Sequence, residues 1–236
     1  YSKNFAEEVD KYVDIVLVGD SLGSVLYNYT STKKVTLTEM INHSKSVRLG
    51  VKKSLMVVDM PYKTYETKNL ALKNAKKIIK ESKADAIKVE GGKKIIKIIE
   101  HLRKNKINVM GHLGILPQSH KGKFKYKGKT ILERKNLLSD ARLLQKSGVF
   151  SIVLECIETN LAKKITNELR IPTIGIGSSV NCDGQVLVTD DLIGLNLTSI
   201  KFVKSFYDIR KHINIAIKNF SKDVKSKKYP SKKFSY

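Results

Sequence analysis

Short runs of Val, Ile and Leu alternate along this chain with longer segments of helical periodicity. Such continuous runs are typical of parallel β-strands covered on both faces, because both rows of side chains are then buried. Repeated strand–helix units predict a parallel α/β protein, either a doubly wound sheet or a (β/α)8 barrel. We expect strands at 14–20, 54–60, 86–92, 108–114, 151–157 and 172–178, with a weaker candidate at 200–204.

Two kinds of signal predict helices between these strands. Thr36 and Glu39 form a capping box that begins a helix, and Gly50 is placed to end it. Two later segments repeat apolar residues every three or four positions, which gives each helix one apolar face. No linker or internal repeat divides the chain, so we expect one domain over 1–236, with 221–236 as a Lys-rich C-terminal extension. The two apolar faces consist of Ala71, Ala75, Ile78 and Ile79, and of Ile209, Ile213, Ala216 and Phe220.

The composition narrows the class of protein. Hydrophobic residues make up 41% and charged residues 28%, which is typical of a globular protein. No run reaches the roughly 18 apolar residues of a membrane span, and no signal-peptide pattern is present, so we expect a cytoplasmic protein. A net charge of +23 raises the hypothesis of nucleic-acid binding, but the excess is nearly all lysine. Because phosphate and base recognition relies on arginine, we attribute the charge to surface composition.

Polar side chains lie at or near the C-terminal ends of five predicted strands. That is the end at which open α/β sheets and barrels place their active sites. A buried charge is costly unless it is paired or binds a metal, so the pattern indicates a ligand site. Three carboxylates are hard oxygen ligands that suit Mg²⁺, whereas Zn²⁺ lacks enough His and Cys partners here. The side chains are Asp20, Asp59, Lys88, Glu90, His112 and Glu155, and His120 is a further histidine expected near the same mouth.

The string Gly-Asp-Ser-Leu at 19–22 raises a different hypothesis, a serine hydrolase in which Ser21 is the nucleophile. Hydrolases with this string carry a later Gly-x-Asn-Asp segment and a C-terminal Asp-x-x-His that supplies the base. The nearest matches here are 194–197, which lacks the Asp, and 208–212, which is one residue too long. Without a base a serine hydroxyl is a poor nucleophile, so the sequence argues against this hypothesis.

Collinear motifs over the whole chain resemble the ketopantoate hydroxymethyltransferase family. The most specific are VGDSLG and the segment that begins VMGHLG and ends LPQS. The full set is VGDSLG (18–23), VTLTEMINHSKSVRLG (35–50), VVDMPY (57–62), IKVEGG (87–92), VMGHLGILPQS (109–119), VLEC (153–156), IPTIGIG (171–177), DGQVLV (183–188), KFVK (201–204) and the closing YPSKKFSY.

The resemblance implies a (β/α)8 TIM barrel whose first strand lies upstream of the numbered chain. It implies a Mg²⁺-dependent transfer of a hydroxymethyl group from 5,10-methylenetetrahydrofolate to 3-methyl-2-oxobutanoate, giving ketopantoate for pantothenate and coenzyme A synthesis. It also implies a homo-oligomer, a decamer in this family. By motif, the family's site residues correspond to Glu155 as the proton acceptor, to Asp20, Asp59 and Glu90 as metal ligands, and to Asp20, Ser21, Asp59, Lys88 and His112 around the keto acid.

One other enzyme class stays open on sequence grounds. Mg²⁺-dependent carbon–carbon lyases of the isocitrate lyase and phosphoenolpyruvate mutase type act on keto acids through a similar barrel and enolate. They usually carry a Lys-Lys-Cys-Gly-His loop, which this chain lacks. Product formation without folate would favour the lyase.

Overall fold

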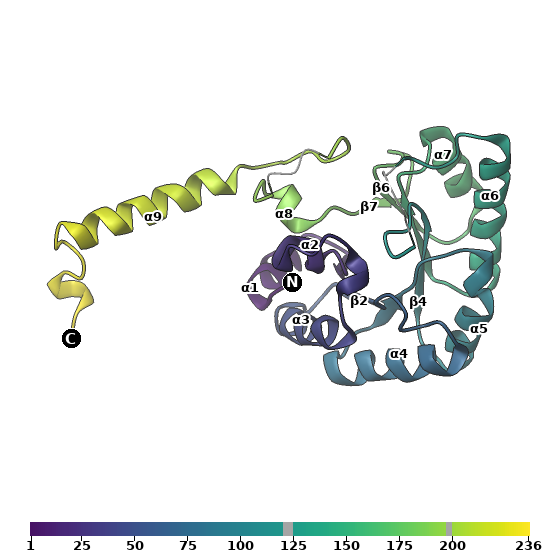
Figure 1. The fold of residues 1–236 in the computed structure, drawn as a ribbon, viewed down its shortest axis with the longest axis horizontal. Coiled ribbons are helices and arrows are strands. Elements are labelled where there is room, and N and C mark those ends of the chain that lie inside the picture. Colours follow the sequence, from purple (N-terminus) through teal and green to yellow (C-terminus); the bar gives the residue numbers. More distant parts are fainter. Residues whose placement is uncertain (120–124, 197–199) are drawn as a thin grey trace. The chain divides into compact units, whose positions relative to one another are not determined.

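The computed structural model describes residues 1–119, 125–196 and 200–236, and His120 falls outside these ranges. Seven parallel strands form one curled sheet in the order β1 to β7 (Figure 1). A doubly wound sheet reverses its strand order at a switch point, whereas a barrel adds each strand beside the previous one, so the observed order is that of a (β/α)8 barrel. The strands are β1 Ile15–Val18, β2 Leu55–Asp59, β3 Ala86–Lys88, β4 Val109–Gly114, β5 Ser151–Glu155, β6 Thr173–Ile176 and β7 Gly184–Gln185.

Six of these strands lie within the runs expected from sequence, and β7 was not expected. The weak candidate at 200–204 was wrong: Ile200 and Val203 form a hydrogen-bonded turn there. A strand needs a neighbour to take up its backbone hydrogen bonds, and this Lys-flanked stretch pairs with no described strand. The third run was also shorter than expected, since β3 ends at Lys88 and Glu90 follows it.

The helices begin and end as local chemistry requires. Thr36 and Glu39 form the expected capping box, with Thr36 Oγ1 accepting from the Glu39 N–H at 3.2 Å. Gly50 is the last residue of α3, and a Cβ there would lie 2.3 Å from the Lys3 carbonyl oxygen, so close packing against α1 requires the glycine. The helices are α1 Lys3–Val9, α2 Leu22–Tyr27, η1 Thr32–Lys34, α3 Leu37–Gly50, α4 Lys68–Ser82, η2 Lys93–Ile95, α5 Ile96–Lys104, α6 Ile131–Lys146, α7 Thr159–Glu168, α8 Thr189–Leu192, α9 Ile209–Lys225 and η3 Lys232–Phe234.

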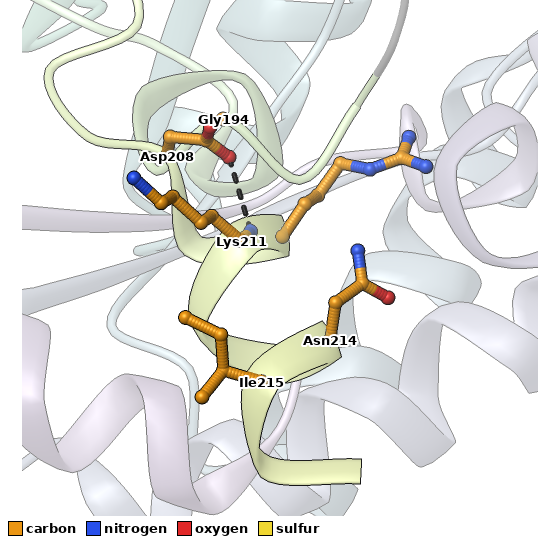
Figure 2. A pocket seen from close by; sticks show the side chains of 6 residues that line it. Gly194, Asp208, Lys211, Asn214 and Ile215 are labelled. Atoms are coloured by element: carbon orange, nitrogen blue, oxygen red, sulfur yellow. Dashed lines mark hydrogen bonds between the residues drawn. The ribbon is translucent and has the colours of Figure 1, made fainter. Parts of the chain in front are cut away.

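The chain divides into two compact units, Tyr1–Val186 and Leu187–Tyr236. The second unit contains α8, α9 and an open pocket of about 570 Å³ beside the start of α9 (Figure 2). The sequence correctly predicted a helix with an apolar face here, but Ile213 and Phe220 on that face are exposed. A single domain over 1–236 stays a prediction. No helix among the described residues is long and apolar enough to cross a membrane.

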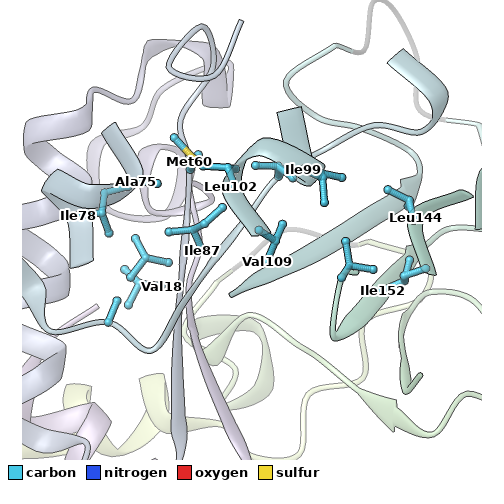
Figure 3. Packing of buried hydrophobic residues seen from close by; sticks show 14 of the residues in the cluster. Val18, Met60, Ala75, Ile78, Ile87, Ile99, Leu102, Val109, Leu144 and Ile152 are labelled. Carbon is cyan, nitrogen blue, oxygen red and sulfur yellow. The ribbon is translucent and has the colours of Figure 1, made fainter. Parts of the chain in front are cut away.

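The sheet of the first unit has two different faces. One face packs against the helices and forms the main core, in which Val18, Ile87 and Ile152 meet residues of α4, α5 and α6 (Figure 3). The other face carries a small apolar cluster made of strand residues, including Val57, Ala86 and Met110. Because side chains alternate along a strand, every second residue after these points to the same face as this cluster.

Candidate active site

Strand alternation brings the predicted polar residues together on the face of the sheet that carries the small apolar cluster. Asp59 follows Val57 by two residues, Lys88 follows Ala86, and His112 follows Met110. The parallel register pairs Asp59 with Lys88 directly across β2 and β3. Glu155, two residues after Val153, ends β5 beside β4. The polar groups therefore stand at the carboxyl ends of the strands, directly beyond the small apolar cluster.

Asp59 is buried and is held at both carboxylate oxygens. Lys88 Nζ donates to Asp59 Oδ1 at 2.6 Å, and the Asp20 backbone N–H donates to Asp59 Oδ2 at 3.1 Å. Burial alone would lower the pKa of Lys88, but the charges of Asp59, Glu90 and Asp20 outweigh it and raise that pKa above its usual value. Lys88 is therefore a buried ammonium that is paired with a buried carboxylate.

His112 is fully buried between two glutamates. Its Nδ1 lies 3.4 Å from Glu90 Oε1, and its Nε2 lies 3.2 Å from Glu155 Oε2. Burial and the Lys88 charge would lower the pKa of His112, but the interactions with Glu155 and Glu90 raise it to about 9. His112 thus lies between the predicted proton acceptor and a predicted metal ligand, although neither ring nitrogen has hydrogen-bond geometry to a described residue. The Glu155 side chain is about a fifth exposed, so it remains accessible to a substrate.

Two residues with no role predicted from sequence complete the cluster. Gln118 is buried, and its amide nitrogen donates to Asp20 Oδ2 at 2.8 Å. The Tyr65 hydroxyl donates to Gln118 Oε1 at 2.6 Å. Gln118 lies in the LPQS motif, and this motif was the sequence signal that could have identified it as a site residue. A motif does not, however, reveal which carboxylate the glutamine will contact. Nothing in the sequence distinguishes Tyr65 from the nine other tyrosines.

Ser21 is not arranged as a nucleophile. Its Oγ lies 2.6 Å from the Tyr1 hydroxyl, and no histidine among the described residues hydrogen-bonds to it. Ser21 instead adjoins Asp20 at the edge of the carboxylate cluster.

The donor chemistry of the cluster fits a divalent cation. Asp20, Asp59 and Glu90 are all buried, and burial together with the charges of Asp59 and Glu90 raises the pKa of Asp20 to about 8. Three hard oxygen donors that repel one another in this way favour an added cation such as Mg²⁺. In the described ranges, no three His, Cys, Asp or Glu side chains already lie close enough together to hold a metal ion.

A strained turn places Glu155. A Cβ on Gly114 would lie 2.0 Å from the Glu155 carbonyl oxygen, so β4 and β5 approach closely only because this residue is glycine. The next residue, Cys156, adopts a left-handed conformation with φ of 49°, which is uncommon for a side chain other than Asn or Asp. Burial and the Glu155 charge raise the pKa of the Cys156 thiol to about 11, so it is no thiolate at neutral pH. Strain of this kind is typical of functional sites.

We expect Cys156→Val to destabilise the protein by about 1–3 kcal/mol, because a β-branched side chain fits the left-handed region poorly. The free energy of unfolding of Cys156→Gly is expected to stay within about 1 kcal/mol of that of the unmodified protein, since glycine adopts this conformation freely. Urea denaturation measures both, and Cys182→Val is a control at a buried cysteine outside the left-handed region. Equal losses for the two valine variants would show that backbone strain at Cys156 is not the cause.

The solved structures that resemble this chain share its fold at low sequence identity. A phosphonopyruvate hydrolase, solved with oxalate and Mg⁺⁺, has a TM-score of 0.60 at 9% identity and covers 99% of this chain and 85% of its own. A 2,3-dimethylmalate lyase of the phosphoenolpyruvate mutase/isocitrate lyase superfamily has a TM-score of 0.55 at 14% identity, over 74% of this chain and 62% of its own. These similarities support the barrel-type fold alone and do not favour lyase chemistry.

Sequence relatives are much closer. A 3-methyl-2-oxobutanoate hydroxymethyltransferase of Pelagibacter ubique (strain HTCC1062) is 65% identical over the whole chain and 91% of its own length. A protein of the same name from Carboxydothermus hydrogenoformans is 45% identical over 98% of this chain and 85% of its own. The family model for ketopantoate hydroxymethyltransferase matches residues 1–232. The motifs, the barrel-type sheet and these relatives together show that the chain belongs to the ketopantoate hydroxymethyltransferase family.

Proposed function

We propose that this enzyme transfers a hydroxymethyl group from 5,10-methylenetetrahydrofolate to 3-methyl-2-oxobutanoate in a Mg²⁺-dependent reaction that yields ketopantoate. The observation that carries the proposal is the contact between His112 and Glu155 beside three buried carboxylates. A carboxylate base held next to a divalent-cation site is the arrangement needed to remove a weakly acidic proton beside a carbonyl group.

Each residue of the cluster has a distinct task in this proposal. Asp20, Asp59 and Glu90 would hold Mg²⁺, which when bound supplies the Lewis acidity that stabilises negative charge on the keto oxygen. Lys88 and Ser21 orient the keto acid through its carboxylate, and His112 lines its pocket. Glu155 accepts the C3 proton of the keto acid. In the overall transfer, C3 forms a bond to the methylene carbon, and the two bonds from that carbon to the folate nitrogens break. One water supplies the hydroxyl oxygen and keeps one of its protons, while its other proton and the proton taken from C3 end on the two nitrogens of tetrahydrofolate, which leaves.

Metal removal tests the proposal directly. After treatment with EDTA, the protein is expected to form no ketopantoate from the two substrates, and added Mg²⁺ is expected to restore activity, because the enolate is too unstable without a cation. Product measured by mass spectrometry decides the result. An undiminished rate in EDTA would contradict the metal requirement, and conversion of the keto acid without folate would favour a lyase instead.

Three further points belong to the same proposal. The family name implies a place on the route to pantothenate and coenzyme A. A cytoplasmic location and a homo-oligomer, decameric by resemblance, are proposed with it. The assembly can be measured by light scattering on the purified chain.

A further inference from the structure

Gln118 has every side-chain hydrogen-bonding group directed at the carboxylate cluster or its supports. The residue is 2% exposed, so these hydrogen bonds replace water. Its amide nitrogen donates to Asp20 Oδ2 at 2.8 Å and to the Met60 carbonyl oxygen at 2.9 Å. Since that carbonyl can only accept, the amide orientation is determined, and a flipped amide would bury its oxygen against two acceptors.

Tyr65 closes a ring with Gln118 and Glu90. The Tyr65 hydroxyl donates to Gln118 Oε1 at 2.6 Å and accepts from the Glu90 backbone N–H at 3.3 Å. The Gln118 backbone N–H donates to Glu90 Oε2 at 3.1 Å. We call this hydrogen-bonded ring the Tyr65–Gln118 bridge. Through it, Asp20 and Glu90, which follow different strands, are connected by protein groups.

All the side-chain donors in the bridge are neutral, and this distinguishes them from Lys88. A lysine beside a carboxylate offers a positive charge that would compete with a metal ion, and Lys88 is placed in this way at Asp59. An amide and a phenol instead fix the position of a carboxylate and leave its negative charge available. Burial and the Glu90 charge raise the pKa of Tyr65, so its hydroxyl stays a donor.

We propose that the Tyr65–Gln118 bridge holds Asp20 and Glu90 against their mutual repulsion, so that both face one divalent cation. Tyr65 and Gln118 are then positioning residues that act through the two carboxylates. The inference rests on the proposed function, because it assumes that these carboxylates bind Mg²⁺. It assigns a purpose to two side chains that the transfer chemistry does not otherwise need.

Tyr65→Phe tests the bridge with the smallest change, since it removes one hydroxyl and keeps the ring packed. Titration calorimetry on the full chain, with Mg²⁺ alone as the probe, is expected to show a Kd about tenfold higher than in the unmodified protein, the usual effect of losing a support behind a metal ligand. The Mg²⁺ concentration for half-maximal activity should rise in parallel, whereas kcat at saturating Mg²⁺ should return to near its original value. A merely structural role would lower kcat without this dependence.

Tyr29→Phe is the matched control. The Tyr29 hydroxyl also supports a glutamate, donating to Glu39 Oε1 at 2.8 Å, but at the start of α3. This control is expected to leave the Mg²⁺ Kd unchanged. Gln118→Leu removes the side-chain hydrogen bonds to Asp20, Met60 and Tyr65, while the backbone N–H at 118 can still donate to Glu90. It is expected to raise the Kd further because Asp20 loses its support; if it fails to fold, Tyr65→Phe decides alone.

The outcomes separate the two proposals. If the unmodified protein binds Mg²⁺ and Tyr65→Phe binds it with the same Kd, the bridge has no positioning role and the inference is overturned. If the unmodified protein neither binds Mg²⁺ nor needs it for activity, the proposed metal dependence fails, and the inference fails with it. A raised Kd in Tyr65→Phe alone, with Tyr29→Phe unchanged, supports the bridge.

Discussion

Glu155→Gln is expected to slow exchange of the C3 proton of 3-methyl-2-oxobutanoate with solvent deuterium by about 10²–10⁴-fold, the usual contribution of a general base. Glutamine keeps the size of the side chain but cannot accept the proton. NMR detection of the exchange in the presence of Mg²⁺, without folate, isolates this step from carbon–carbon bond formation. Ketopantoate formation should fall by a similar factor.

The matched control is Glu81→Gln, which neutralises a surface glutamate paired with Lys45 at 2.7 Å. It is expected to exchange the proton at the original rate. Thermal melting of both variants checks that each is folded. This check matters for Glu155→Gln because the buried His112 loses a charged neighbour. Undiminished exchange in Glu155→Gln would remove Glu155 from the role of base.

Lys88→Met is expected to lower the free energy of unfolding by about 3–5 kcal/mol, because it leaves Asp59 buried without its cation. Both side chains of the pair are almost fully buried, at 6% and 4% exposure. Urea denaturation in the absence of Mg²⁺ measures the loss. Activity should fall as well, since Lys88 is proposed to anchor the substrate carboxylate.

Two further variants make this result specific. Lys45→Met breaks the exposed pair with Glu81 and is expected to cost no more than about 1 kcal/mol. The double variant Lys88→Met/Asp59→Asn removes both charges and is expected to recover part of the lost stability. If Lys88→Met and Lys45→Met lower the free energy of unfolding equally, Asp59 is not a buried charged group that depends on Lys88.

Much of the site could be predicted from sequence because barrel geometry follows from local patterns. An apolar run that ends in a polar residue identifies the carboxyl end of a buried strand, as at Asp59 and Glu155. Parallel strands bring such ends to one edge of the sheet. The convergence of these polar side chains could therefore be predicted without knowledge of their contacts. The position of Glu90 illustrates the limit: its side chain joins the cluster, although β3 ends two residues earlier.

Other features depended on long-range contacts that no local pattern encodes. Gln118 reaches Asp20 from 98 positions away along the chain. Its four hydrogen bonds form only when the segments that follow β1, β2, β3 and β4 meet at one edge of the sheet. The candidate strand at 200–204 had suitable residues but pairs with no strand in the part of the chain that the structure describes. The reason in both cases is that hydrogen bonds between distant segments are decided by which groups the fold brings within about 3 Å.

The amino-acid sequence by itself determined the strand–helix alternation, the family, and the chemical types at the strand ends, because these follow from hydrophobic periodicity and collinear motifs. Only the tertiary structure decided which partner each charged group has: Lys88 is paired with Asp59, His112 lies between Glu90 and Glu155, and Asp20 accepts a hydrogen bond from the neutral amide of Gln118. Pairing depends on distance and burial in three dimensions, since a charge in low dielectric interacts strongly with whichever group lies next to it.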